Sequence, residues 1–277
     1  MKKLNSAKKE IIKEAGKSFH RSLKKGTKSK GTEDLSKQRL TNHGIPEKLM
    51  EELMNKSREF FELPEEEKKE FGDGDQGPFA PIRELAFEFT SKIKGVVRNL
   101  LEGIAESLGL ESNSIIESTG FDSGAFQVFA VNFYPPCPQP HLAQGLPPHS
   151  DQGFMTLVMQ NGIGGLQVKH DGKWVNVNPL PNSFVVVIGD QVEVLSNGRY
   201  ESALHRAILN NTVTRMTLVV AHGPALDKEI GAAPEILEKE KPVFRRYKYQ
   251  DYFHFQQKTR FADKSSLEEV RLRVDEQ

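Results

Sequence analysis

The chain has 277 residues, of which 37% are hydrophobic and 27% are charged, so it can bury a sizeable core beneath an ordinarily charged surface. Its 38 Lys and Arg balance 38 Asp and Glu, which leaves no overall field to draw it to nucleic acid or anionic lipid. The single cysteine, Cys137, excludes an internal disulfide and a cysteine-based zinc site. Without a secretory segment or a membrane-spanning apolar run, we expect a single-domain, monomeric protein of the cytoplasm.

Residues 1–41 are predicted to form a basic leader. The first thirty residues hold eleven Lys or Arg against only Glu10 and Glu14, and they offer no apolar pattern for a core. We interpret this segment as a solvated, poorly ordered tail. A nuclear-type address or a phosphate-binding arm is the alternative.

Residues 42–120 are predicted to form a helical amino-terminal region. Apolar residues at near-helical spacing predict a helix over 46–61. After a Gly- and Asp-rich stretch at 72–77, a second amphipathic run over 82–108 predicts a longer helix. Its apolar stripe should lie against a sheet.

Residues 121–277 are dominated by short β-rich runs, followed by a short closing helix expected from Ser266 to Val274. Strands at such regular spacing indicate a barrel or a sandwich. Asp171-Gly172 predicts a two-residue hairpin, and Asn197-Gly198 marks another turn. The predicted strands are 126–134, 154–159, 165–170, 173–177, 183–188, 202–209 and 215–221.

His149 and Asp151 are candidate metal ligands, because residues two apart in an extended strand point to the same face. His205 lies 54 residues beyond Asp151, and a neighbouring strand would bring it alongside. Two imidazoles and one carboxylate form the facial triad that leaves coordination positions open on non-haem Fe(II). A lone strand histidine is more often structural, and the remaining histidines are assigned that role.

Arg215 begins an apolar strand and is a candidate carboxylate binder. Its planar fork pairs bidentately with carboxylates, and Thr217 places a hydroxyl on the same face. Asn132 and Tyr134 likewise share one face of a strand that ends just before the metal-bearing segment. The alternatives are a strand-end salt bridge for Arg215 and plain core hydrogen bonds for the other two.

Six segments from about residue 42 onward carry further motifs. They are 42–54, the helix near 93–110, 132–140 (NFYPPCPQP), 145–153 (GLPPHSDQG), 164–207 and 215–217 (RMT). Together they resemble the plant-type 2-oxoglutarate-dependent dioxygenases. That family includes flavonoid oxidases, hormone-oxidising enzymes and salicylate hydroxylases linked to downy-mildew susceptibility.

The resemblance implies a mainly β fold: a double-stranded β-helix, or cupin-like jelly roll, with helices packed outside it. By motif position it makes His149, Asp151 and His205 the iron ligands. It implies that Arg215 and Thr217 bind the carboxylate of 2-oxoglutarate and that Asn132 and Tyr134 make further contacts with it. The implied cofactors are Fe(II), 2-oxoglutarate and O2, with ascorbate as reductant. The implied reaction hydroxylates or desaturates a small phenolic, flavonoid or hormone-like metabolite and releases succinate and CO2.

Three departures from the family pattern lead to alternatives to an active dioxygenase. Thr217 replaces the usual Ser, no opening strand is recognisable before Asn42, and the stretch between Phe71 and Pro81 is short. A truncated isoform or an impaired paralogue would retain the metal site and act as a binding module. A cupin-like isomerase or hydrolase with another divalent metal is the third interpretation, and Arg215 argues against it.

Overall fold

The computed structural model describes residues 39–69, 80–258 and 264–273. Most of the predicted leader and the Gly- and Asp-rich stretch lie outside these residues, as does the shortening predicted between Phe71 and Pro81. The helices are α2 (Glu47–Glu62), α3 (Glu65–Lys69), α4 (Ala80–Ser107), α5 (Ser114–Thr119), α6 (Phe121–Gly124), α7 (Asp190–Leu195), α8 (Pro234–Leu237), α9 (Tyr249–Lys258) and α10 (Ser265–Val270). The strands are β1 (Arg39–Leu40), β2 (Ala125–Tyr134), β3 (Leu146–His149), β4 (Met155–Gln160), β5 (Leu166–His170), β6 (Lys173–Asn176), β7 (Phe184–Ile188), β8 (His205–Ala207), β9 (Arg215–Ala225), β10 (Glu229–Ile230) and β11 (Tyr247–Lys248).

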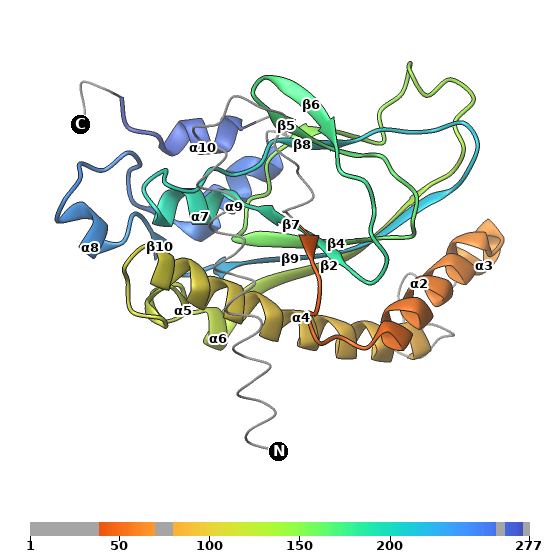
Figure 1. The fold of residues 1–277 in the computed structure, drawn as a ribbon, viewed down its shortest axis with the longest axis horizontal. Coiled ribbons are helices and arrows are strands. Elements are labelled where there is room, and N and C mark those ends of the chain that lie inside the picture. The colour runs from red at the N-terminus through yellow and green to blue at the C-terminus, as the bar shows by residue number, and fades with distance from the viewer. Residues whose placement is uncertain (1–38, 70–79, 259–263, 274–277) are drawn as a thin grey trace.

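Two antiparallel sheets face each other and form the jelly-roll core that the sequence predicts (Figure 1). The larger sheet has the order β1-β7-β4-β9-β2, and the smaller has the order β3-β8-β5-β6. Side chains from both sheets meet between them, because Val158 and Val185 of the larger sheet share one apolar cluster with Leu166 and Val168 of the smaller. The two sheets are therefore joined by a packed apolar layer.

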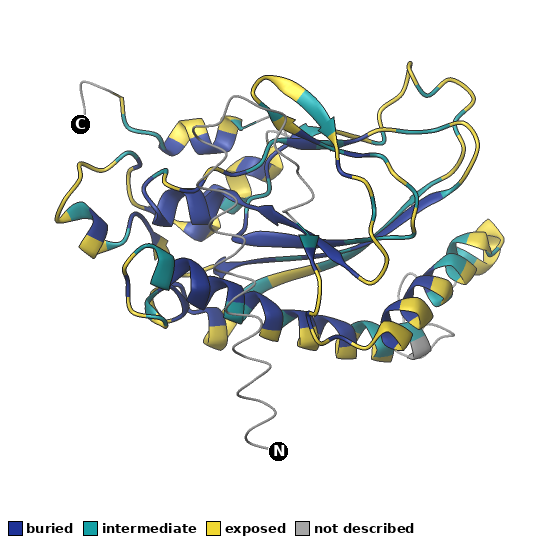
Figure 2. Ribbon diagram, viewed as in Figure 1, coloured by how far each residue is buried: buried dark blue, intermediate teal, exposed yellow. Residues whose placement is uncertain are grey.

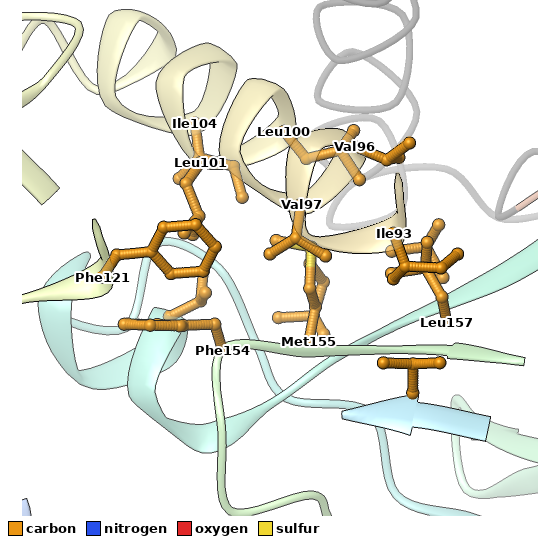
Figure 3. Packing of buried hydrophobic residues seen from close by; sticks show 14 of the residues in the cluster. Ile93, Val96, Val97, Leu100, Leu101, Ile104, Phe121, Phe154, Met155 and Leu157 are labelled. Carbon is orange, nitrogen blue, oxygen red and sulfur yellow. The ribbon is translucent and has the colours of Figure 1, made fainter. Parts of the chain in front are cut away.

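Helix α4 covers the outer face of the larger sheet (Figure 1). Figure 3 shows its apolar stripe packed on β4, where Met155 and Leu157 point outward. Ile93, Val97 and Leu101 follow one another at four-residue spacing and are all fully buried, while the opposite side of the helix is exposed (Figure 2). Each such side chain contributes roughly 2 kcal/mol by leaving water. No helix in the described part of the chain is long and apolar enough to cross a bilayer.

The structure confirms the main sequence expectations. The predicted helices correspond to α2, α4 and α10, although α10 ends at Val270 and not at Val274, and the seven predicted strands correspond to β2, β4, β5, β6, β7, β8 and β9. Asp171 and Gly172 have φ of 47° and 75° between β5 and β6, as a hairpin turn with two left-handed residues requires. The run predicted over 202–209 is wrong in extent, since β8 spans only three residues.

The opening strand that is not recognisable in the sequence before Asn42 is present as β1. Strand β1 pairs with β7 through Arg39 opposite Val185 and Leu40 opposite Phe184. Two residues are too few to show the alternation that identifies a strand in a sequence. Strand β1 therefore lies within the range predicted as the leader, 1–41. Helix α7 also escaped prediction, because all six of its residues are buried and it has no polar face to give helical periodicity.

Candidate metal centre

Strands β3 and β8 bring the two predicted histidine ligands together. His149 ends β3 and lies directly opposite His205, the first residue of β8. Cross-strand partners project to the same face of a sheet, so the imidazole rings lie side by side with centroids 4.2 Å apart. The pairing confirms that a neighbouring strand closes the 54-residue separation from Asp151 to His205.

Asp151 completes a compact group of three ligands. Its Oδ1 lies 3.5 Å from Nε2 of His149 and 3.7 Å from Nε2 of His205. One ligand atom from each of the three residues lies within 4.8 Å of the others. Two imidazole nitrogens and a carboxylate oxygen are the donors of a non-haem Fe(II) facial triad.

Local hydrogen bonds orient both histidines for metal binding. Nδ1 of His149 lies 2.8 Å from the carbonyl of Pro147, and Nδ1 of His205 lies 2.9 Å from the carbonyl of Ala203. A carbonyl only accepts hydrogen bonds, so each Nδ1 carries the proton and each Nε2 keeps the lone pair that a metal requires. Asp151 Oδ2 is buried without a hydrogen-bond partner in the described structure, which also fits a bound cation.

The electrostatics favour the ligand state at Asp151 and His205, whereas the contact with Asp151 outweighs burial at His149 and raises its pKa. Burial alone would raise the pKa of Asp151, but the adjacent side chains of His205 and His149 hold that pKa well below its usual range. Burial lowers the pKa of His205, and Asp151 only partly opposes this. At neutral pH the carboxylate is therefore ionised and His205 is neutral, as metal coordination requires.

Helix α7 fixes the backbone that carries Asp151. The backbone N–H groups of Asp190 and Gln191 donate to the carbonyls of Asp151 (2.8 Å) and Gly153 (3.0 Å). The preceding Gly189 lies so close to these carbonyls that a Cβ there would collide with the oxygen of Gly153. Burial raises the pKa of the Asp190 carboxyl to about 6, against the hydrogen bond that it receives from Tyr252. Sequence patterns missed Asp190, and its place directly after an apolar strand was the available signal.

Strands β2 and β9 bring together the four residues predicted to bind 2-oxoglutarate. Asn132 is the cross-strand partner of Thr217, and its Nδ2 donates to the Thr217 hydroxyl at 3.1 Å. Tyr134 is the partner of Arg215, whose guanidinium lies 5.1 Å from the centre of the tyrosine ring. The register of this one strand pair therefore unites all four.

Arg215 is a buried cation without an acidic partner in the described part of the chain. It is 2% exposed, and its Nη2 donates to Oε1 of Gln160 at 3.0 Å. Its Nε is buried and has no hydrogen-bond partner among the described residues. Arg215 forms no ion pair among the described residues, so nothing there supports the alternative of a strand-end salt bridge. A buried, unpaired cation is costly, so the site favours an anionic ligand.

The Arg215 side chain and the metal triad face the same interior. Arg215 reaches across to the smaller sheet, where a Cβ on Gly165 would lie 2.9 Å from Arg215 Cδ. Gly165 also has a φ of +139°, which suits glycine. His205 projects beside its partner Val168, which belongs to the cluster between the sheets. The Arg215 side chain and the triad therefore both lie on the faces that the two sheets turn toward each other.

Comparison with known proteins identifies the family. Residues 125–224 match the 2OG-Fe(II) oxygenase superfamily, and residues 32–102 match a domain described as non-haem dioxygenase in morphine synthesis N-terminal. The chain is 37% identical over 270 residues to 2-oxoglutarate-dependent dioxygenase 19 of Oryza sativa subsp. japonica, covering 84% of this chain and 80% of that protein. It is 34% identical over 258 residues to a flavonol synthase/flavanone 3-hydroxylase of Petunia hybrida, covering 78% and 74%.

Solved structures agree with this relationship. The crystal structure of JOX2 in complex with 2OG, Fe and JA superposes with a TM-score of 0.79 at 27% identity, covering 85% of this chain and 81% of that one. The protein belongs to the 2-oxoglutarate- and Fe(II)-dependent dioxygenases. His149, Asp151 and His205 form its iron-binding triad. When bound there, the iron supplies the oxidising chemistry, and the protein orients the reactants around it.

Proposed function

We propose that the protein hydroxylates or desaturates a small phenolic, flavonoid or hormone-like metabolite, with 2-oxoglutarate as co-substrate and ascorbate as reductant of the iron. In hydroxylation, one atom of O2 enters the metabolite and the other enters succinate as 2-oxoglutarate loses CO2. The observation that carries the proposal is the buried Arg215 guanidinium, which lacks an acidic partner in the described structure and faces the same interior as the triad.

In this proposal Arg215 binds the distal carboxylate of 2-oxoglutarate through its planar fork. Thr217 donates its hydroxyl to the same carboxylate, and Asn132 holds Thr217 in place through the 3.1 Å hydrogen bond. Tyr134 packs its ring beside the guanidinium and contacts the ligand from the neighbouring strand. Thr217 keeps the hydroxyl of the usual Ser and adds a methyl group, so the contact is retained.

The substrate class is supported by the inner face of β2. Val128 is the cross-strand partner of Ala221 and lies on the same strand face as Asn132 and Tyr134. Its side chain is apolar, yet the residue is 40% exposed. An exposed apolar side chain there suits a flat or apolar metabolite. The relatives act in the same range of chemistry, since one is a flavonol synthase and another was crystallised with JA.

The test is succinate formation from 2-oxoglutarate with Fe(II), O2 and ascorbate, together with a screen of phenolic and hormone-like metabolites for a mass gain of one oxygen. We expect wild-type protein to form succinate and Asp151→Ala to form none. His170→Ala is the matched control, because His170 and Asp171 form another His–Asp contact at 3.6 Å, away from the triad. A wild-type protein that binds metal but consumes no 2-oxoglutarate would instead be a binding module.

A monomeric state, a cytoplasmic location and the absence of nucleic-acid binding stay predictions. The balanced charge supports the absence of nucleic-acid binding, and the single cysteine supports the cytoplasmic location. Light scattering of the purified protein checks the first of them.

A further inference from the structure

Helix α9, the second-last helix of the described chain, packs against the back of the metal-bearing turn. Helix α9 lies beside α7 (Figure 1), and its side chains donate hydrogen bonds to Asp190 of α7 and to the carbonyl of Ser150. The contacts join positions 62 and 106 residues apart in the chain. Neither α9 nor these contacts place an atom among the metal ligands themselves.

The first contact runs from Tyr252 through Asp190 to Ser150. The Tyr252 hydroxyl donates to Oδ2 of Asp190 at 2.6 Å, and the Ser150 hydroxyl donates to the same oxygen at 3.2 Å. All three side chains are buried, and Asp190 is 0% exposed. Hydrogen bonds to a buried carboxylate are among the stronger ones in proteins, so this chain of contacts resists distortion.

A second contact reaches the same turn from the same helix. Gln256 Nε2 donates to the backbone carbonyl of Ser150 at 3.1 Å. Ser150 stands between His149 and Asp151 in the sequence. A rotation of its backbone would therefore move one ligand relative to the other. Helix α9 therefore holds Ser150 in two ways. It bonds the Ser150 carbonyl directly through Gln256, and it reaches the Ser150 hydroxyl through Asp190.

We propose that Tyr252 is a positioning residue for the iron site, acting through Asp190 and Ser150 to hold His149 and Asp151 in the geometry that the metal requires. Partners outside the ligand set commonly tune metal affinity by orienting the ligands. Docking of α9 and metal binding are then thermodynamically coupled, and coupling is reciprocal: the metal stabilises the docked helix as the docked helix favours the metal. The inference rests on the metal triad and is independent of the proposed substrate.

The chain offers a matched control in the same helix. Tyr249 is buried like Tyr252, but its hydroxyl has no hydrogen-bond partner among the described residues. Replacing either tyrosine by phenylalanine removes one buried hydroxyl and leaves the ring. Only Tyr252→Phe removes a contact to Asp190, so a difference between the two variants reports that contact.

The experiment is calorimetric titration of the metal-free full chain with Co(II), an air-stable stand-in for Fe(II), accompanied by the visible absorption spectrum of bound Co(II). We expect Tyr252→Phe to bind Co(II) roughly tenfold more weakly than wild type, with shifted ligand-field bands. Tyr249→Phe should match wild type in both readouts. Equal affinity and identical spectra for the two variants would overturn the proposal.

A second measurement needs no variant and covers the case in which Tyr252→Phe fails to fold. Backbone amides of α9 in wild-type protein should exchange hydrogen for deuterium more slowly with Co(II) bound than without it. Unchanged exchange of α9 contradicts the coupling. If wild-type protein binds no Co(II), the triad assignment fails and this inference fails with it. If wild type binds Co(II) but Tyr252→Phe binds it equally well, only this inference fails.

Discussion

The metal triad and the Arg215 cluster both bury charge between the two sheets, but they stabilise it differently. In the triad, the Asp151 carboxylate lies within 3.7 Å of two imidazoles, so its charge has partners within the protein. Arg215 has an amide oxygen and an aromatic ring for partners, and the described structure offers it no acid. The triad is a complete ligand set, whereas the Arg215 cluster is completed only by an anion.

The largest expected effect comes from the triad. Asp151→Asn keeps the size of the side chain but removes the negative charge that attracts the metal, and its amide nitrogen is a poor ligand. We expect no Fe(II)-dependent succinate formation above background, measured by mass spectrometry. Near-normal turnover in this variant would show that Asp151 is not a ligand.

Replacing Arg215 should separate stability from ligand binding. Arg215→Met removes the proposed carboxylate partner, which costs about 3 kcal/mol and raises the KM for 2-oxoglutarate by roughly 100-fold. The same change removes a buried unpaired cation, so the ligand-free protein should gain about 1 kcal/mol or more of unfolding free energy. Urea unfolding and initial-rate kinetics check the two halves. A variant that loses stability while its KM stays unchanged would contradict this account of the cluster.

His222 is another buried base, on β9 like Arg215 but on the strand face toward α4. Burial, reinforced by the charge of Lys94, lowers the pKa of His222 from 6.5 to about 4. The unfolded chain therefore takes up a proton before the folded one does, so stability is lost as the pH falls from 6.5 toward 4. The expected loss between pH 7.5 and 5.5 is about 1 kcal/mol.

The matched variant for that pH effect is His222→Gln, whose amide can still donate to Oε1 of Gln127, the present 2.9 Å partner of His222. It does not titrate in this range. Urea unfolding at both pH values should therefore show a smaller loss in the variant than in wild type. An equal loss in the two proteins would assign the pH dependence to other groups.

The smallest effect is expected at Thr217. Thr217→Ser keeps the hydroxyl that accepts from Asn132 and removes one methyl group, worth about 0.8 kcal/mol when buried. We expect the KM for 2-oxoglutarate to change by no more than about fourfold. Thr217→Val is the complementary change, since it keeps the shape and loses the hydroxyl. Thr217→Val should raise the KM for 2-oxoglutarate more than Thr217→Ser does.

The sequence predicts those site residues that lie close together in the chain. Arg215 and Thr217 stand two residues apart in β9, where alternation places both on one face. His149 and Asp151 have the same spacing, and their ligand atoms also meet, although β3 ends at His149. The long amphipathic helix α4 was predictable for a similar reason, because its buried residues recur with helical spacing.

What could not be predicted depends on contacts between distant segments. The role of Asp190 follows from its contacts with Ser150 and Tyr252, which lie 40 and 62 residues away in the chain. No local pattern encodes such a contact. Strand β1 is too short for a pattern, and α7 is too uniformly buried to show one.

Each histidine ligand takes its orientation from a carbonyl two residues before it, Pro147 for His149 and Ala203 for His205. Pro147 lies within β3, and Ala203 lies two residues before β8 begins, so both contacts are local to the histidine ligands. Remodelling of loops farther along the chain therefore leaves the ring tautomers undisturbed. Surface loops also tolerate sequence change better than packed strands do. The protein can therefore acquire new pocket walls, by natural divergence or by engineering, while the reactive centre stays chemically the same.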